Sequence, residues 1–147
     1  MSEKGPIQDS LSRYARQTIL KEVGIEGQAR LASSSVLVVG AGGLGSAALY
    51  YLAAAGVGRL GIVDYDQVSL SNLQRQILYT SADLGNNKVD IAALRLQALN
   101  PAVRTDKHQV QINAGNAQSI ISGYDLVVDA VDNLPTRYIV NDACCAL

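Results

Sequence analysis

The longest uncharged part of the chain lies between Arg30 and Arg59 and holds two successive apolar patterns. Residues 36–39 (VLVV) form a short run with three valines, which is typical of a strand buried on both faces. After a glycine-rich turn, residues 46–55 form an alanine-rich run that is apolar nearly all round, so we expect a helix buried on more than one side. Because glycines divide the stretch into separate elements, it does not indicate a membrane span.

Further along the chain, short apolar runs alternate with segments of helical spacing. Leu70, Leu73 and Ile77 repeat at helical spacing, so we expect the apolar side of this polar segment to pack. Strands that alternate with helices are typical of α/β domains with a parallel sheet. The predicted elements are short helices over residues 11–20 and 24–33, a strand over 60–63, a helix from Asn86 or Asn87 to Leu99, a strand over 103–112, a short helix over 116–122, a strand over 125–131 and a helix from Pro135 onward.

Composition narrows the class of protein. With 147 residues, of which 48% are hydrophobic and 17% charged, the chain has the composition of one soluble domain. A net charge of −1 gives no support for binding to nucleic acid or to a membrane. Cys144 and Cys145 are adjacent, which fits neither a disulfide framework nor a C-x-x-C zinc site and favours small apolar residues on a helix. Residues 1–10 are polar, unlike a secretory signal, so we expect a flexible tail and a cytoplasmic location.

The first predicted strand leads directly into a glycine motif. Gly40, Gly42 and Gly45 fit the pattern G-x-G-x-x-G, which combines a tight turn, close approach of the backbone to a ligand and close packing of helix on strand. The helix that follows offers free N–H groups to an anion such as phosphate. Asp64 follows the second strand at about the distance where such folds place a ribose-binding acid. We therefore expect a Rossmann-like nucleotide site, with a sheet-packing turn that binds no ligand as the alternative.

Two charged residues extend this predicted site. Asp132 follows the strand over residues 125–131, and parallel strands end at one edge of a sheet, so Asp64 and Asp132 should face the glycine loop across one crevice. Lys88 falls in the first turn of its predicted helix, where a cation opposes the helix dipole. This placement costs a few tenths of a kcal/mol unless an anion compensates for it.

Other polar residues permit two interpretations. Asn72, Gln74 and Arg75 give their segment more hydrogen-bonding capacity than a plain connection needs, although a solvated face is the alternative. His108 lies among polar neighbours on the strand over residues 103–112. We expect it to be a solvated surface residue, with a catalytic part as the less favoured interpretation.

Six motifs, in order, resemble the ThiF/MoeB/HesA family, the ubiquitin-activating-type adenylyltransferases. The combination of a double-glycine loop with SNLQRQ is highly specific to that family. The motifs are RYARQ (13–17), VLVVGAGGLG (36–45), the pair Asp64-x-Asp66, VSLSNLQRQ (68–76), Gly85-x-x-Lys88, and Asp132-Asn133 followed by Arg137.

The resemblance implies that ATP and Mg²⁺ activate the C-terminal Gly-Gly carboxylate of a ubiquitin-like sulfur-carrier protein of the MoaD or ThiS type, with release of pyrophosphate. By match to the family's motifs, Arg16 (from a second subunit), Arg75, Lys88 and Asp132 would be catalytic. Asp132 would hold the magnesium ion and Asp64 the ribose hydroxyls. The nucleotide-binding set implied by the resemblance is Gly40, Gly42, Gly43, Gly45, Asp64, Asp66, Ser71, Asn72, Leu73, Gln74, Arg75, Lys88, Asp132 and Asn133.

The resemblance also implies features outside this sequence. Residues 11–147 correspond to the ATP-binding half of the family's domain, so we expect the fold to be incomplete at its C-terminus. The half that docks the carrier, and the zinc that two C-x-x-C pairs usually bind there, would follow residue 147. The helix over residues 46–55 and the role of Arg16 together predict a homodimer.

Two other functions stay open on the sequence alone. A glycine loop with an acid is also the fingerprint of an NAD-dependent dehydrogenase domain, but that function leaves Asn72, Arg75, Lys88 and Asp132 without roles. A nucleotide-binding or dimerisation module without turnover is the second alternative, because the carrier-docking half is absent from this sequence.

Overall fold

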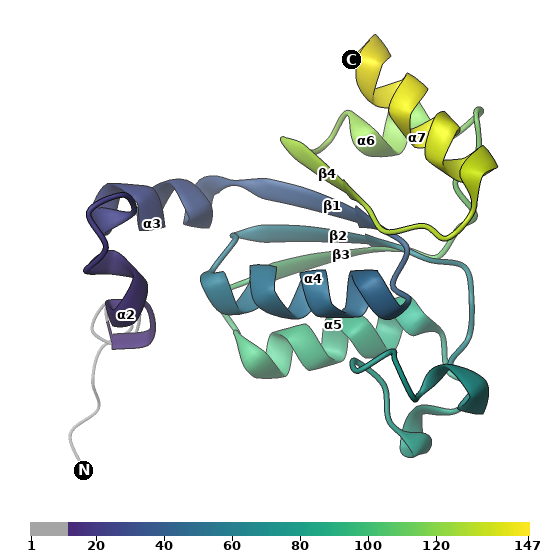
Figure 1. Ribbon diagram of the computed structural model, residues 1–147, viewed down its shortest axis with the longest axis horizontal. Helices are drawn as coiled ribbons and strands as arrows, with labels where there is room; N and C mark the ends of the chain where they lie inside the picture. The colour runs from purple at the N-terminus through teal and green to yellow at the C-terminus, as the bar shows by residue number, and fades with distance from the viewer. Residues whose placement is uncertain (1–11) are drawn as a thin grey trace.

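Four parallel strands form one sheet in the computed structural model, which describes residues 12–147 (Figure 1). The strand order is β3-β2-β1-β4. The chain adds β2 and β3 on one side of β1 and then returns to add β4 on the other side. Such a sheet confirms the predicted Rossmann-like α/β class. The predicted tail, residues 1–10, lies outside the described residues. The strands are β1 (Ser35–Val39), β2 (Arg59–Val63), β3 (Arg104–His108) and β4 (Leu126–Asp129).

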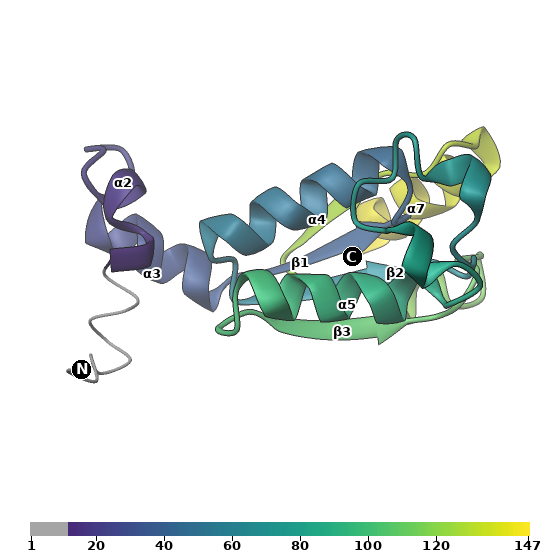
Figure 2. The same cartoon turned by 90° about the horizontal axis from the view of Figure 1, so that it is seen from below.

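Helices cover both faces of this sheet (Figures 1 and 2). The first face carries α4 (Gly43–Ala55) and α5 (Lys88–Leu99), and the second carries α6 (Ala117–Ile121) and α7 (Leu134–Ala146). This arrangement explains the unbroken apolar run of β1, because successive side chains point to opposite faces and both faces are buried.

Each face has its own hydrophobic core. Val36 and Val38 of β1 contribute to the cluster under α4 and α5, whereas Leu37 and Val39 contribute to the cluster under α6 and α7. The first cluster also includes Ala41, Leu49, Ala53, Val57, Leu60, Ile62, Val68, Leu78, Tyr79, Val89, Ala92, Leu96 and Val103, and the second also includes Val63, Ile112, Ala117, Ile121, Val140 and Ala143.

The two N-terminal helices, α2 (Ala15–Thr18) and α3 (Gly24–Ser33), lie at the end of the sheet opposite the carboxyl ends of the strands (Figures 1 and 2). Tyr14, which precedes α2, is buried against Gly56 and joins a hydrogen-bond network with the buried Asn100. Asn100 Nδ2 donates to Tyr14 Oη and to the Ala53 carbonyl, both at 2.7 Å. These bonds attach the N-terminal segment to the ends of α4 and α5.

Several predicted boundaries differ from the structure. Helix α4 begins three residues before the predicted start, because the Ser46 N–H already donates to the Gly42 carbonyl at 2.8 Å. Strand β3 ends at His108 rather than at residue 112, and β4 is shorter than predicted at both ends.

The packing predicted for residues 70–77 is confirmed only for Leu73, which is partly buried against the first cluster, and is wrong for Leu70 and Ile77. Only a short 3-10 helix, η1 (Leu70–Asn72), forms there, and a second, η2 (Ser81–Asp83), follows it. Leu70 and Ile77 are exposed, because the segment crosses the open end of the sheet instead of lying on a face.

Within the described residues, no helix has the length and apolar character that crossing a membrane requires.

Candidate functional site

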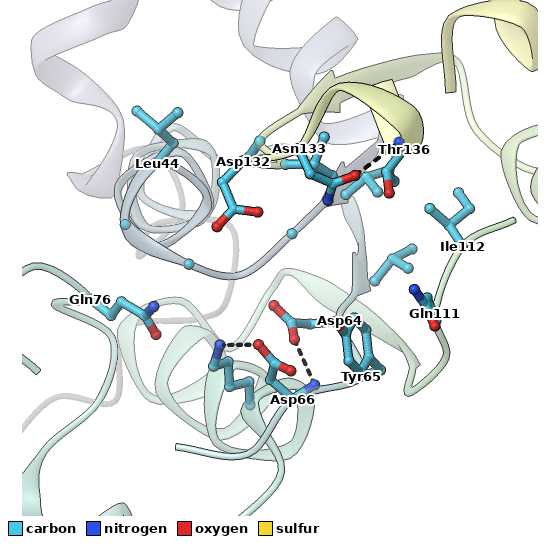
Figure 3. Close-up of a pocket in the computed structure, with 18 of the residues that line it drawn as sticks. Leu44, Asp64, Tyr65, Asp66, Gln76, Gln111, Ile112, Asp132, Asn133 and Thr136 are labelled. Atoms are coloured by element: carbon cyan, nitrogen blue, oxygen red, sulfur yellow. Dashed lines mark hydrogen bonds and ion pairs between the residues drawn. The ribbon is translucent and has the colours of Figure 1, made fainter. Parts of the chain in front are cut away.

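A cleft of about 570 Å³ opens at the carboxyl ends of the strands, between the loops that follow the neighbouring strands β1 and β4 (Figure 3). The reversal of strand order there leaves a crevice between neighbouring loops, which is where open α/β sheets bind ligands. Its volume lies within the range of ordinary small-molecule sites. The residues that line it are Val39, Gly40, Gly42, Gly43, Leu44, Val63, Asp64, Tyr65, Asp66, Asn72, Arg75, Gln76, Lys88, Val110, Gln111, Ile112, Ala130, Val131, Asp132, Asn133 and Thr136.

The glycine loop between β1 and α4 forms the floor of the cleft, and each glycine has a different reason to lack a side chain. Gly40 has a φ of +94°, and a Cβ there would lie 2.9 Å from the Ala130 carbonyl oxygen. A Cβ on Gly45 would lie 1.8 Å from the Gly40 carbonyl oxygen, so this glycine lets α4 pack directly on the loop. Gly42 has no such clash, and its bare backbone faces the cleft near the first turn of α4.

Asp64 directly follows β2, and its side chain reaches the glycine loop. Its Oδ2 accepts a hydrogen bond from the Ala41 N–H at 2.8 Å, and its Oδ1 accepts one from the Asp66 N–H at 2.8 Å. The carboxylate is therefore fixed beside the glycines by the backbone, with further acceptor capacity on both oxygens. This geometry suits a pair of hydroxyl donors such as those of a ribose.

Lys88 and Asp66 form an ion pair inside the cleft. Lys88 is 3% exposed, its Nζ lies 2.9 Å from Asp66 Oδ2, and its N–H donates to the Asp66 carbonyl at 3.0 Å. The anion needed to offset a cation at the start of α5 is thus supplied by Asp66. The ammonium group has two further donors, which remain available to a ligand.

Arg75 and Asp132 line the cleft from two different segments of the chain. Arg75 packs its aliphatic carbons near Gly43, where a Cβ would meet its Cγ at 3.5 Å, and its side chain is exposed. Asp132 follows β4 and presents an exposed carboxylate to the cleft (Figure 3). Asn133, the next residue, begins α7 by accepting a hydrogen bond from the Thr136 N–H at 3.0 Å.

The carboxylates of the cleft suit a magnesium ion only if a ligand supplies further oxygen atoms. Among residues 12–147 there is no group of three His, Cys, Asp or Glu side chains that could hold a metal by itself. Mg²⁺ is commonly bound by one or two carboxylates together with substrate phosphates and water. Asp132, beside a loop suited to phosphate, therefore fits a magnesium ion that arrives with a nucleotide.

Not every predicted site residue lies at the cleft. Gly45 supports the loop from below, and Ser71, Leu73 and Gln74 do not line the cavity wall. Arg16 is exposed on α2 at the opposite end of the molecule. The remaining predicted residues, Gly40, Gly42, Gly43, Asp64, Asp66, Asn72, Arg75, Lys88, Asp132 and Asn133, all line it.

Several residues of the cleft wall were not predicted from the sequence. Val110, Gln111 and Ile112 were assigned to a strand, whereas the chain leaves β3 at His108 and brings them to the cleft. Gln76 ends the motif VSLSNLQRQ and is 4% exposed. Its position beside Arg75 was the one signal available, since burial of a polar side chain cannot be read from the sequence.

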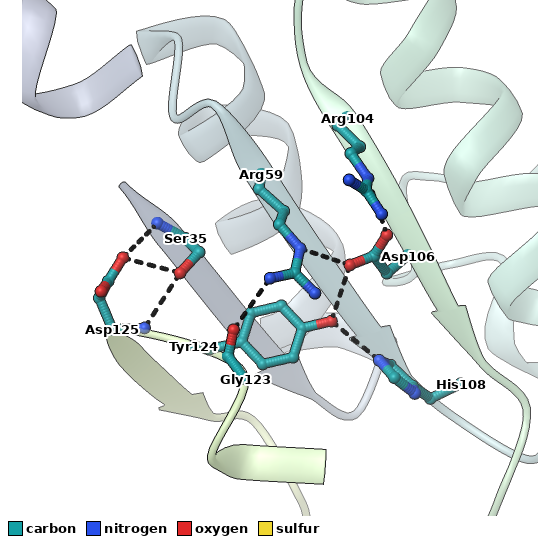
Figure 4. Close-up of polar contacts among 8 residues, drawn as sticks. All are labelled: Ser35, Arg59, Arg104, Asp106, His108, Gly123, Tyr124 and Asp125. Atoms are coloured by element: carbon teal, nitrogen blue, oxygen red, sulfur yellow. Dashed lines mark hydrogen bonds and ion pairs between the residues drawn. The ribbon is translucent and has the colours of Figure 1, made fainter. Parts of the chain in front are cut away.

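A separate polar cluster connects β2, β3 and the loop before β4 (Figure 4). Arg59 pairs with Asp106 at 2.5 Å and stacks over the Tyr124 ring at 4.5 Å, while Tyr124 Oη lies 2.8 Å from His108 Nε2. Burial lowers the pKa of His108 and raises the pKa of Tyr124 to about 12. The expectation that His108 is a solvated surface residue was therefore wrong, because Tyr124 covers it, and His108 does not line the cleft.

Comparison with known proteins gives a consistent result. The model of a family described as the ThiF family matches residues 14–147. A sulfur carrier protein adenylyltransferase of Thermus thermophilus is 58% identical over 139 residues, covering 95% of this chain and 51% of its own length. An adenylyltransferase and sulfurtransferase MOCS3 of Anopheles gambiae is 50% identical, covering 95% of this chain and 32% of its own length. The chain thus spans about a third to a half of these relatives.

Solved structures show the same architecture. The E. coli tRNA N6-threonylcarbamoyladenosine dehydratase TcdA, in complex with ATP, superposes with a TM-score of 0.87. The two chains are 28% identical, and the match covers 92% of this chain and 56% of TcdA. The fold described above therefore also occurs in a protein that has been solved with ATP.

Proposed function

This chain belongs to the ThiF family, and we propose that it is the nucleotide-binding part of an adenylyltransferase that activates the C-terminal Gly-Gly carboxylate of a ubiquitin-like sulfur-carrier protein. The observation that carries the proposal is the convergence of the glycine loop, Asp64, Arg75, Lys88 and Asp132 on one cleft. The names of the relatives at 58% and 50% identity support the activity and the class of substrate.

The proposed reaction needs positive charge more than it needs a base. A carboxylate oxygen of the carrier attacks the α-phosphorus of ATP, a C–O–P linkage forms, and the bond to the β-phosphate oxygen breaks to release pyrophosphate. The attacking group is already ionised at neutral pH, so no proton has to be removed. Attack by one anion on another is assisted by cationic groups that offset the charge of the phosphates.

Residues of the cleft can supply this charge and hold the nucleotide. Asp64 would bind the ribose hydroxyls through its remaining acceptor positions, and the loop N–H groups before α4 would receive phosphate oxygens. Arg75 and Lys88 would contact the phosphates, with Lys88 already oriented by Asp66. A magnesium ion, when bound with ATP at Asp132, would supply further charge stabilisation at the phosphates.

Two further parts of the proposal concern assembly. Helix α4 carries the exposed Leu44 and Tyr51 on the side away from the sheet, which supports a homodimer that buries this side. Arg16 lies far from the cleft of its own chain, so a contribution to catalysis requires a second subunit. The expected cytoplasmic location and a zinc site beyond residue 147 stay predictions.

The competing functions are less well supported. An NAD-dependent dehydrogenase would leave the Lys88–Asp66 pair and Asp132 without a role in the cleft. A nucleotide-binding or dimerisation module without turnover would not need catalytic residues. Arg75, Lys88 and Asp132 are proposed to be such residues.

Titration calorimetry on the full-length protein tests the choice of ligand. ATP with Mg²⁺ should bind more tightly than NAD, because the cationic side chains match a triphosphate. Exchange of labelled pyrophosphate into ATP, dependent on added carrier protein, tests the reaction itself. Tighter binding of NAD, or the absence of carrier-dependent exchange, would overturn the proposal.

A further inference from the structure

The turn between β4 and α7 presents Asp132 to the cleft, but no neighbouring side chain holds its carboxylate (Figure 3). The carboxylate is exposed and forms no ion pair or side-chain hydrogen bond with any of residues 12–147. Its direction therefore depends on the backbone of residues 130–133 and on the torsions of its own short side chain. The groups that fix this backbone decide where a ligand of Asp132 can lie.

Both polar groups of the Val131 backbone are held by the two side chains of one ion pair. Asp129 Oδ1 accepts a hydrogen bond from the Val131 N–H at 3.1 Å, and Arg137 Nη2 donates one to the Val131 carbonyl at 2.9 Å. Arg137 Nε lies 3.2 Å from Asp129 Oδ2, so the two side chains also hold each other. A residue of β4 and a residue of α7 thus enclose the residue that directly precedes Asp132.

The same turn is seated on the first glycine of the nucleotide loop. The Ala130 N–H donates to the Val39 carbonyl at 2.9 Å, and the Val131 side chain packs against the second core. A Cβ on Gly40 would lie 2.9 Å from the Ala130 carbonyl oxygen and 3.4 Å from the Val131 nitrogen. A shift of Val131 would therefore move Asp132 relative to the loop that is proposed to bind phosphate.

Arg137 belongs to the motif of Asp132 and Asn133, yet it does not line the cleft. We propose that Arg137, paired with Asp129, is a positioning residue that holds Asp132 within reach of a magnesium ion bound with a nucleotide. This inference rests on the proposed binding of ATP with Mg²⁺. Groups behind a metal ligand commonly fix its orientation, and the planar fork of arginine can engage two acceptors at once.

Replacement of Arg137 by methionine in the full-length protein removes the fork and keeps an unbranched apolar side chain. Titration calorimetry measures ATP affinity with Mg²⁺ and with EDTA, and Mg²⁺ should tighten binding to the wild type. The variant should lose about tenfold of affinity in Mg²⁺ and none in EDTA, because only the placement of Asp132 changes. Asp129→Asn, which breaks the same ion pair, should act in the same direction.

A double variant separates positioning from an independent role. Arg137→Met combined with Asp132→Ala should bind ATP with Mg²⁺ no more weakly than Asp132→Ala alone, because Arg137 acts through Asp132. Hydrogen–deuterium exchange without nucleotide should be faster in Arg137→Met for peptides that contain Val131. Arg104→Met is the matched control, since Arg104 Nε also lies 3.2 Å from an aspartate, outside the cleft, and it should leave both measurements unchanged.

The possible results fall into two groups. Equal losses with Mg²⁺ and with EDTA, additive losses in the double variant, or unchanged exchange at Val131 would each overturn the positioning role of Arg137. A loss of the Mg²⁺ effect in Asp132→Ala but not in Arg137→Met would overturn it as well, while the proposed function stands. A wild type that does not bind ATP, or binds it equally with Mg²⁺ and with EDTA, would instead overturn the proposed nucleotide and magnesium site.

Discussion

Residues of the cleft differ in the hydrogen bonds and ion pairs that they already form with the rest of the protein. The buried Lys88 pairs with the more exposed Asp66, and Asp64 accepts two backbone hydrogen bonds. Asp132 has an exposed carboxylate that forms no ion pair or side-chain hydrogen bond with any of residues 12–147. A substitution of Asp132 should therefore affect ligand chemistry alone, whereas a substitution of Lys88 would also leave Asp66 without its partner.

Asp132→Ala should abolish carrier-dependent exchange of pyrophosphate into ATP while the protein stays folded. Loss of one magnesium ligand can reduce the rate about a hundredfold or more, which corresponds to about 3 kcal/mol of transition-state stabilisation. Asp142→Ala, an exposed aspartate on the same helix that follows Asp132, is the control. Near-normal exchange by Asp132→Ala would show that the metal, if it is required, is held elsewhere.

Two alanine substitutions in the glycine loop should separate packing from ligand approach. Gly45→Ala places a methyl group 1.8 Å from the Gly40 carbonyl oxygen and should cost about 3 kcal/mol or more of unfolding free energy. Gly42→Ala meets only Gln76 Nε2 at 3.6 Å, so stability should change by less than about 0.5 kcal/mol. Its methyl group would still obstruct a phosphate, and ATP affinity should fall. Urea unfolding and calorimetry measure the two effects, and the reverse ranking in stability would contradict this account of the loop.

At the scale of elements, the crossing segment between β2 and α5 depends on polar contacts rather than on a regular helix. Asp83 of η2 accepts hydrogen bonds from the Thr80 N–H and hydroxyl, each at 2.7 Å, and Arg95 of α5 pairs with it at 2.8 Å. This arrangement ties the segment that carries Asn72, Arg75 and Gln76 to the helix that begins at Lys88. These contacts add to the burial of Leu78 in the first core and hold the segment in place although Leu70 and Ile77 are exposed.

Asp83→Asn should destabilise the protein by about 1 kcal/mol at pH 7, as expected when a helix-terminal carboxylate is removed. Burial raises the pKa of Asp83, but its bonds to Thr80 and Arg95 outweigh burial and lower it. Because the folded-state pKa is lowered, this stabilisation is full above the usual Asp value of about 4 and is lost as the pH falls below it. Unfolding free energies of the two proteins should therefore converge in acid, and a difference that is constant from pH 7 to pH 3 would contradict the assignment.

The N-terminal helices and the cleft lie at opposite ends of the molecule. Tyr14 and Asn100 fasten α2 at one end, and the cleft lies at the other. Arg16 sits on α2 and cannot be brought to its own cleft without breaking these buried contacts. A shared site in a dimer is the arrangement in which Arg16 and Asp132 can act on one nucleotide.

Complementation between two inactive variants tests this shared site. Arg16→Ala and Asp132→Ala, co-expressed as full-length chains, should form mixed dimers in which one of two sites has both native residues. If the three dimers form statistically, activity should recover to about one quarter of the wild type. Light scattering should show twice the monomer mass. A fully active monomer, or no recovery in the mixture, would exclude the contribution of Arg16 from a partner.

Much of the fold and part of the cleft could be predicted because they depend on local patterns. Buried strands, the glycine motif and the order of elements follow from apolar runs and from the few backbone shapes that glycine permits. Parallel strands must end at one edge, so Asp64 and Asp132 were expected to share a crevice, and both line it. The start of α5 at Lys88 was likewise predicted from its flanking residues.

Only the tertiary structure decided which polar residues are buried and with what partners. Asp66 compensates for Lys88, and Tyr124 covers His108, through contacts between segments far apart in the chain. The same limit explains the exposed Leu70 and Ile77, whose spacing resembles a helix that the crossing segment does not form. Gln76 is the clearest case: its sequence neighbours identify a motif, but its Oε1 lacks a hydrogen-bond partner among residues 12–147 only because folding buries this side chain near Gly42. The periodicity of a sequence shows how apolar and polar residues alternate within one segment. The desolvation and pairing of polar side chains depend instead on the residues that other segments bring to the same place.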